Sequence, residues 1–331
     1  MEDPGHGFRA PQGSRRAGRG RAAAGIACIL ASASCYGCMA IFGRFALRSG
    51  ADLPTLLALR FTLAALGMWG VFAWRRQTLP RGRYLAALLA MGAIGYAGQA
   101  FCYFEAITLA SVGLVALLLY LFPAMVAVLN WLVLGHPLSR PQVAAVAVAL
   151  AGSALTIGRA GAGSLLGVLL SLLAAVIVAL YILAGSLLPA TVTPTATATV
   201  IISSAAMVCA GVAAARGLHP PGTAAGWAAL LGVAVVCTVL PILLFFEGLE
   251  RVGPVRASVY STVEPMFTLF LAALLLGERI TATRLAGGAL ILAAVILLAR
   301  EELRCGQAAP AAKPTAARHP APAVPPPIAE G

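Results

Sequence analysis

One acidic side chain of this sequence lies in the middle of a long apolar stretch. Glu264 is the eleventh residue of the stretch 254–276. A helix rises about 1.5 Å per residue, so this residue lies about 15 Å from one end, near the midplane of a membrane core roughly 30 Å thick. A carboxylate at that depth costs several kcal/mol unless it is paired, hydrated or protonated. Glu264 could therefore carry a proton, hold a cationic group or anchor a polar network; a structural hydrogen bond is the alternative.

Proline follows this glutamate directly, and a second proline has an equivalent place earlier in the chain. Pro265 cannot donate a hydrogen bond to the carbonyl of Ser261, and Pro123 cannot donate one to that of Leu119. Free carbonyls at mid-membrane are tolerated where a helix is buried in protein or lines an aqueous cavity. Two such helix breaks at equivalent positions predict a central binding site; packing kinks without a ligand are the alternative.

Further polar and aromatic side chains in the apolar stretches could complete such a site. Arg60 lies about 9 Å into the stretch 54–74, where its fork of donors could bind a carboxylate or anchor the helix at the interface. Glu105 and Glu247 end two stretches, as gating residues or as solvated helix ends. Tyrosines suit a cavity for partly apolar metabolites and are equally typical of interfacial belts. The remaining candidates are Tyr36, Gln99, Tyr103, Tyr120, Tyr181 and Tyr260.

The cysteines and histidines do not form a metal site. Cys35 and Cys38 have CxxC spacing, but they lie in an apolar stretch without further ligands nearby. All four histidines lie outside the apolar stretches. We therefore expect no metal and no cofactor, and we interpret the cysteines as small packing residues.

The composition indicates that the bilayer is the solvent for these elements. Hydrophobic residues make up 60% of the 331 residues and charged ones 10%, against about 25% charged residues in soluble proteins. A membrane span needs roughly 20 apolar residues. On that criterion we predict an all-α membrane protein with ten transmembrane helices, at 24–43, 54–74, 84–104, 112–134, 141–158, 164–184, 195–215, 225–246, 254–276 and 281–299.

The two halves of the chain are related by a shift of 142 residues without gaps. The shift places Phe104 and Glu105 on Phe246 and Glu247, Pro123 on Pro265, and Gly135 on Gly277. Each half then holds five spans, an odd number, so the second half must enter the membrane upside down. Inverted repeats are typical of transporters. We predict repeats at 24–158 and 164–299, with disordered tails at 1–22 and 306–331 that have too few apolar residues to fold.

The placement of basic residues predicts the orientation. Cytoplasmic loops carry an excess of Lys and Arg. With both termini cytoplasmic, sixteen basic residues fall on the inner side and six on the outer side. The net charge of +12 is thereby explained without nucleic acid, which would require a basic face interleaved with aromatic residues. We expect an integral multi-pass protein of the plasma (inner) membrane whose partners are the bilayer and a small-molecule solute.

The ordered motifs resemble those of the EamA-type family of the drug/metabolite transporter superfamily, over roughly residues 24–299. The motifs are Leu59-Arg60-Phe61, Glu264-Pro265, the ending Leu274-Leu275-Leu276-Gly277-Glu278, and the same ending at Leu132-Val133-Leu134-Gly135. The resemblance implies a ten-helix fold with a central cavity, and transport of small metabolites, often amino acids or related compounds and frequently as efflux. One departure is Gly135-His136, where the family usually has Gly-Glu.

The chain has no G-x-x-x-x-G-K-[ST] phosphate loop, so the energy for transport must come from an ion gradient, the gradient of the solute or a partner chain. We therefore predict a secondary carrier for a neutral, zwitterionic or amphipathic solute, with proton coupling through Glu264 as a candidate mechanism. The alternative is a membrane enzyme that acts on a lipid or isoprenoid through Glu264 and Arg60. Acidic residues inside the spans are too few and too far apart to favour that alternative. The oligomeric state stays open.

Overall fold

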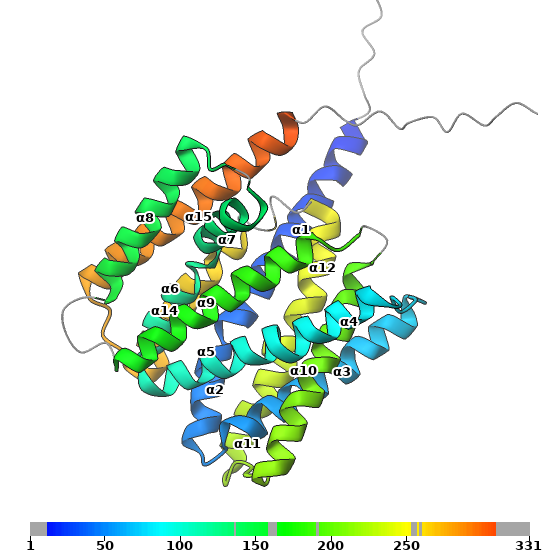
Figure 1. Cartoon of the computed structure of the whole chain (residues 1–331), viewed down its shortest axis with the longest axis vertical. Coiled ribbons are helices and arrows are strands. Elements are labelled where there is room, and N and C mark those ends of the chain that lie inside the picture. The colour runs from blue at the N-terminus through cyan, green and yellow to red at the C-terminus, as the bar shows by residue number, and fades with distance from the viewer. Residues whose placement is uncertain are drawn as a thin grey trace, which may run out of the picture.

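The computed structural model describes residues 12–135, 137–157, 164–189, 192–252, 257 and 260–308. Every regular element in these ranges is a helix (Figure 1). Residues 1–11 and 309–331 of the two predicted tails lie outside the described ranges. The first helix begins at Gln12 and the last ends at Ala308. Residues 12–22 and 306–308, which the sequence assigned to the tails, are therefore helical.

The first half contains α1 (Gln12–Gly37), α2 (Met39–Arg48), α3 (Leu53–Trp74), α4 (Arg83–Ala90), the π-helical segment η1 (Met91–Tyr96), α5 (Ala97–Leu109), α6 (Val112–Leu119), α7 (Phe122–Leu134) and α8 (Arg140–Ile157). The second half contains α9 (Leu165–Ser186), α10 (Pro194–Arg216), α11 (Ala224–Leu231), the π-helical segment η2 (Gly232–Val239), α12 (Leu240–Val252), α14 (Val263–Leu276) and α15 (Ala282–Ala308).

The number of helices that can cross a membrane differs from the predicted ten. Eight helical runs in the described residues are long and apolar enough to do so. The two remaining predicted spans coincide with α8, which starts with the polar sequence Arg140-Pro141-Gln142, and with α14, an apolar helix of 14 residues. Each predicted span therefore has a helix, but the structure does not establish ten crossings.

The helices of the two halves pair with one another. Helix α3 packs along α10 and α8 packs along α15, and in each pair one helix is the equivalent of the other under the 142-residue shift. Helix α1 packs along α12, just as its equivalent α9 packs along α5. The same contacts therefore occur twice with the halves exchanged, which indicates a pseudo-two-fold relation. Figure 1 shows the α8–α15 pair and the α3–α10 pair in separate parts of the bundle.

Glycine brings equivalent helices into backbone contact. A Cβ atom at Gly287 of α15 would lie 2.5 Å from the carbonyl oxygen of Gly152 on α8, and one at Gly152 would lie 2.7 Å from that of Gly287. Small residues at such crossings are characteristic of helix association in membranes. A side chain at either position would force this pair apart.

Equivalent helices also start and end in the same way. Asp52 caps α3 by accepting a hydrogen bond from the backbone N–H of Thr55, and Thr193 caps α10 in the same manner; each helix has a proline in its first turn. Helices α7 and α14 end at Gly135 and Gly277, whose φ angles of 70° and 68° are left-handed. Local sequence therefore sets these boundaries.

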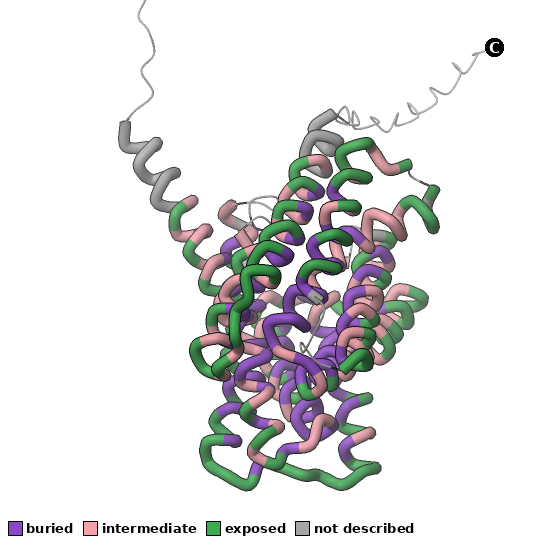
Figure 2. Tube along the Cα trace, turned by 90° about the vertical axis from the view of Figure 1, so that its left-hand side faces the viewer, coloured by how far each residue is buried: buried purple, intermediate pink, exposed green. Residues whose placement is uncertain are grey.

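Apolar side chains cover both the interior and the outer surface. Buried residues follow the inward faces of the helices, while exposed residues follow the outer faces (Figure 2). Large apolar side chains are among the exposed ones; Leu66, Ile94 and Met207 are 65%, 75% and 73% accessible. An apolar exterior around an apolar interior is what a protein surrounded by lipid tails requires.

Candidate functional site

Three helices are interrupted near one another inside the bundle. Helix α1 ends at Gly37 and α2 starts after Cys38, a turn separates α6 from α7, and α14 starts after a turn at Thr262. The hydroxyl of Thr268 donates to the carbonyl oxygens of both Gly37 and Glu264, at 3.1 Å each. This threonine therefore ties the end of α1 to the first turn of α14.

The prolines predicted to break helices lie in the first turns of the helices that follow the interruptions. Pro123 lies in the first turn of α7 and Pro265 in that of α14. A first-turn proline is tolerated because its missing N–H would lack a partner within the helix there in any case. In both halves the chain turns just before the proline and then resumes as a helix.

Glu264 is partly accessible in the first turn of α14. The hydroxyl of Tyr120 lies close enough to hydrogen-bond with its carboxyl group. Tyr36 and Tyr103 lie within electrostatic range of Glu264 and also of Arg60. Three tyrosines, from α1, from α5 and from the turn after α6, therefore lie near Glu264, and the first two also lie near Arg60.

Arg60 is buried, with 4% of its surface accessible. Its Nε atom donates to Oγ1 of Thr238 at 3.0 Å, and Thr238 in turn donates to the carbonyl oxygen of Val233 at 2.8 Å. The guanidinium lies 4.8 Å from the ring centre of Phe61 and 5.5 Å from that of Phe104, in cation–π range. Among the described residues, Arg60 forms no ion pair. The positive charge is held in place by the protein but is not neutralised by any of these residues.

A cavity adjoins this arrangement. A space of about 200 Å³ is lined by Tyr36, Tyr96 and Tyr181 together with apolar side chains. The rings of Tyr96 and Tyr181 are stacked, with their centres 6.2 Å apart, and Tyr96 also contacts Phe61 at 5.2 Å. Because Phe61 lies against Arg60, the aromatic lining connects the cavity to the guanidinium.

A second cavity extends from this lining toward one end of the molecule. It measures about 430 Å³ and shares Tyr181 and Ala198 with the first cavity. Its other lining residues include Pro189, Val192 and Pro194, where the chain passes from α9 to α10. The two cavities together point from the tyrosines to that end of the bundle, which is the predicted cytoplasmic end.

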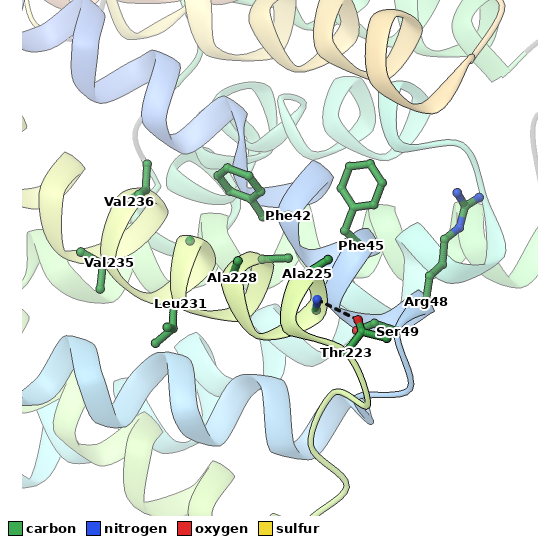
Figure 3. A pocket seen from close by; sticks show the side chains of 13 residues that line it. Phe42, Phe45, Arg48, Ser49, Thr223, Ala225, Ala228, Leu231, Val235 and Val236 are labelled. Atoms are coloured by element: carbon green, nitrogen blue, oxygen red, sulfur yellow. Dashed lines mark hydrogen bonds between the residues drawn. The ribbon is translucent and has the colours of Figure 1, made fainter.

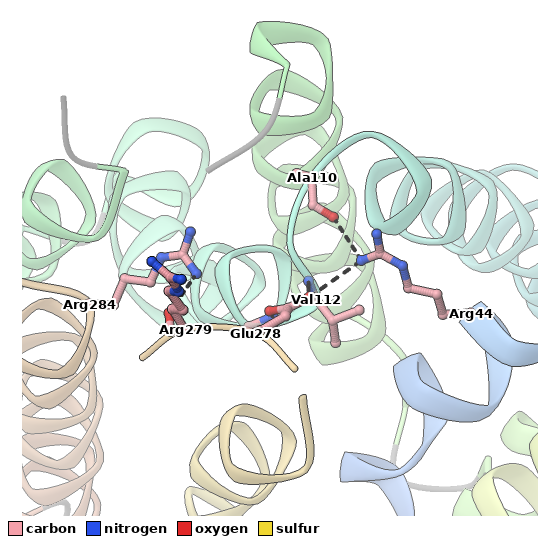
Figure 4. A network of polar contacts seen from close by, with 7 residues as sticks. Arg44, Ala110, Val112, Glu278, Arg279 and Arg284 are labelled. Carbon is pink, nitrogen blue, oxygen red and sulfur yellow. Dashed lines mark hydrogen bonds and ion pairs between the residues drawn. The ribbon is translucent and has the colours of Figure 1, made fainter. Parts of the chain in front are cut away.

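Polar contacts join the two halves at the opposite end (Figure 4). The carboxylate of Glu278 accepts from the backbone N–H groups of Val112 at 2.7 Å and Gly113 at 3.1 Å, the first residues of α6. Arg44 pairs with the same carboxylate at 3.4 Å and donates to the carbonyl oxygen of Ala110 at 3.3 Å. A carboxylate at a helix N-terminus is favoured by free N–H groups and by the helix dipole. We call Arg44, Glu278 and the α6 N-terminus the outer latch, because they lie at the end predicted to face outward. Position 136, the counterpart of Glu278 in the first half, lies outside the described residues.

The structure brings most of the predicted site residues together. Tyr36 and Tyr181 line the first cavity. Tyr36, Tyr103 and Tyr120 lie near Glu264, and Tyr36 and Tyr103 also lie near Arg60. The other predicted residues do not join this group. Gln99 is partly accessible on α5 without a polar contact among the described residues, Tyr260 is partly accessible, Glu105 is exposed, and Glu247 is exposed in an ion pair with Arg251.

Sequence reasoning missed three residues that the structure connects to the site or to the latch. Tyr96 lies next to Gly95, in a glycine-rich stretch that reads as a packing surface. Thr268 looks like an ordinary helical threonine, because its long-range partner is the carbonyl of Gly37. Glu278 follows a helix-ending glycine and reads as a solvated helix end, because its backbone partners lie about 165 residues away.

In the described part of the chain, no group of three or more His, Cys, Asp or Glu side chains could hold a metal ion. Cys35 and Cys38 are both free thiols.

The EamA-like transporter family matches this chain twice, over residues 23–158 and 165–300. The two matches are offset by 142 residues, which is the shift that relates the helices. A Bacillus subtilis (strain 168) protein named uncharacterized transporter YcbK is 28% identical over 276 residues, or 78% of this chain and 87% of the relative. An uncharacterized transporter of Archaeoglobus fulgidus is 36% identical over 80 residues, or 24% of this chain and 30% of the relative.

A protein solved by crystallography shares the fold. Its structure aligns with a TM-score of 0.58 at 20% identity, over 85% of this chain and 99% of its own. At that level of identity the match indicates a common arrangement of helices. Together with the family match, it identifies the bundle as a membrane transporter architecture.

Proposed function

Because this chain belongs to the EamA-like transporter family, a membrane transporter family, we propose that it is a secondary carrier that moves a small metabolite by alternating access. We further propose ten membrane crossings in two inverted repeats, with both termini cytoplasmic. The solute binds between Arg60 and Glu264, where it contacts the surrounding tyrosines. Efflux is the proposed direction.

The observation that carries this proposal is the unequal pairing of the two charged groups. Glu264 has Tyr120 as a hydrogen-bond partner, whereas Arg60 has Thr238 and no acidic partner among the described residues. A buried charge is stable when it is paired and fully hydrogen-bonded. An anionic group of the solute would pair with the guanidinium, and phenol rings would contact its apolar part. One base and one acid suit a neutral, zwitterionic or amphipathic solute better than a multiply charged one.

The two ends of the molecule support alternating access. The outer latch joins the halves at one end, while the cavities extend from the tyrosines toward the other end. This arrangement fits a carrier whose site is accessible from the cytoplasmic side. Opening to the outside requires the latch to break and the cavity near α9 and α10 to close.

Solute flux into liposomes tests the proposal. Purified protein is reconstituted, and uptake of amino acids, purines and small amphipathic cations is measured with and without an imposed pH gradient. We expect saturable flux of one class that depends on the gradient. Protein-free liposomes and liposomes with heat-unfolded protein are the controls. If folded protein moves none of these classes, the proposed solute range is wrong.

A further inference from the structure

A groove separate from the transport site lies on the outer surface of the bundle. It has a volume of about 960 Å³ and lies between α2 on one side and α11 with η2 on the other (Figure 3). Its walls are apolar along most of their length, with Phe42, Phe45, Leu231, Val235 and Val236 among them. Phe45, Leu231 and Val235 are 40%, 48% and 50% accessible, so the groove opens to the surroundings of the protein.

One end of this groove is polar. Arg48, Ser49 and Thr223 line it there, and Figure 3 shows Arg48 beyond Phe45 at that end. Arg48 is the last residue of one membrane-spanning helical run, and Thr223 directly precedes another. The polar end therefore lies at the membrane interface, while Val236 lies deeper. Among the described residues, Arg48 forms no ion pair and no side-chain hydrogen bond.

The length of the groove matches one leaflet of the bilayer. Thirteen positions separate Thr223 from Val236, which is about 15 to 20 Å along a helix. Half of a hydrocarbon core roughly 30 Å thick is about 15 Å. A lipid tail that starts at the interface would thus end near Val236. An apolar wall of this length matches an acyl chain better than a polar, water-soluble metabolite. A single arginine at one end of the wall matches a charged headgroup better than a protein surface.

We propose that this groove is a binding site for an anionic phospholipid; its leaflet, the outer one, rests on the proposed cytoplasmic position of both termini. The phosphate pairs with the guanidinium of Arg48, and one acyl chain lies along α11 and η2. Arginine forms bidentate hydrogen bonds with phosphate, and these are strong at the edge of an apolar region. A headgroup without an ammonium is preferred, because an ammonium would compete with Arg48 for the phosphate charge. Nothing in the proposed transport function requires this site.

Native mass spectrometry of the full chain in detergent tests the site, with phosphatidylglycerol or phosphatidylcholine added at equal concentration. We expect the wild-type protein to retain phosphatidylglycerol about fivefold better, the advantage that one arginine near the headgroups gives. In Arg48→Gln the two lipids should bind equally. Arg279→Gln removes another exposed arginine at the same end of the bundle and should keep the fivefold preference.

A second variant tests the part of the groove that would hold the acyl chain, apart from the headgroup contact at Arg48. Ala228 lines the groove and is exposed, so Ala228→Phe should fill the groove and lower the binding of both lipids several-fold. If that variant fails to fold, Leu231→Trp, at another exposed lining residue, replaces it. The proposal is overturned if Arg48→Gln keeps the preference of the wild type. It is also overturned if particles with two chains are found and Ala228→Phe makes them monomeric, because a second copy would then occupy the groove.

Discussion

At the scale of single residues, the buried guanidinium of Arg60 is the group that an anionic partner would stabilise most. Its side chain is 4% accessible, and its Nε atom has the hydroxyl of Thr238 as an acceptor. The terminal nitrogens of a guanidinium carry further N–H donors, and a buried charge without a counter-charge is unstable. Phe61 and Phe104 compensate in part through their ring faces. An anionic solute group that arrives at this position would gain more here than at an exposed arginine.

The first prediction concerns Glu264. Glutamine at this position has the same shape and can still hydrogen-bond with Tyr120, so Glu264→Gln should fold with a nearly unchanged melting temperature. If the carboxyl group carries the coupled proton, the variant should transport solute at the same rate with and without a pH gradient. The measurement is the ratio of the two rates in liposomes. Glu105→Gln, which changes an exposed glutamate of α5, should keep the ratio of the wild type. A ratio in Glu264→Gln equal to that of the wild type would exclude proton coupling through this residue.

The second prediction concerns the position of Arg60. Thr238→Val removes the acceptor of Nε while keeping the volume of the side chain and the charge of Arg60. We expect KM for the solute to rise several-fold, because the guanidinium is no longer fixed, and stability to fall by about 1 kcal/mol. Thr199→Val is the matched control, since the hydroxyl of that buried threonine donates to Thr195 in its own helix. Equal KM values for the two variants would show that Thr238 does not position Arg60.

At the scale of helices, the sequence predicts where the elements lie better than how they are interrupted. Apolar length and caps such as Asp52 and Gly277 are local signals, so the predicted spans coincide with helices. The π-helical segments η1 and η2 lie at equivalent positions under the 142-residue shift, yet no residue pattern distinguished them from α-helix. Such segments are frequent at functional sites, and η2 contains Thr238, the acceptor of the bond from Arg60.

The site could be predicted only in part, because residue types can be read from the sequence whereas tertiary contacts cannot. An acid, a base and tyrosines in apolar stretches are conspicuous in the sequence, and six of the eight proposed binding residues gather at one place. Gln99 and Tyr260 do not join them, because the face of a helix that points inward depends on its neighbours. Glu278 was not found because backbone N–H groups, which every residue has, are its partners.

The third prediction concerns the outer latch. Glu278→Gln removes the ion pair with Arg44 and weakens the cap on α6, two losses of about 0.7 kcal/mol each for partly exposed groups. We expect the equilibrium to shift about tenfold toward a state that is open to the outside. In a background without the native cysteines, labelling of Ser111→Cys, at a position whose side-chain oxygen is buried, by a membrane-impermeant thiol reagent should become faster to a similar degree. Glu247→Gln, which breaks an exposed ion pair within α12, should leave the labelling rate unchanged. Equal rates in both variants would mean that the carboxylate does not hold this end closed.

At the scale of the whole molecule, the two halves have equivalent helix pairs, but their charged residues are not at equivalent positions. Helices α3 and α10, and likewise α8 and α15, pair with their own equivalents. The positions equivalent to Arg60 and Glu264 are Ile202 and Phe122, which carry no charge. In the proposed cycle, the halves exchange conformations as a symmetric pair while a single site binds one solute. Because the equivalent helices meet through close contacts such as Gly152 with Gly287, we propose these pairs as the pivots of that motion.

The fourth prediction compares a covalent linker across the outer latch with one between the pivot helices α3 and α10. In a background without the seven native cysteines, a cleavable linker between cysteines at positions 44 and 278 should stop transport, because it ties the halves together where they must separate. A linker between cysteines at 77 and 193 should leave transport largely intact. Those residues hydrogen-bond at 2.6 Å where α3 and α10 lie close, and a pivot does not open. Cleavage of the linker should restore flux in the 44–278 variant. If the 77–193 linker stops transport as completely as the 44–278 linker, then α3 and α10 separate during the cycle and cannot be the pivot.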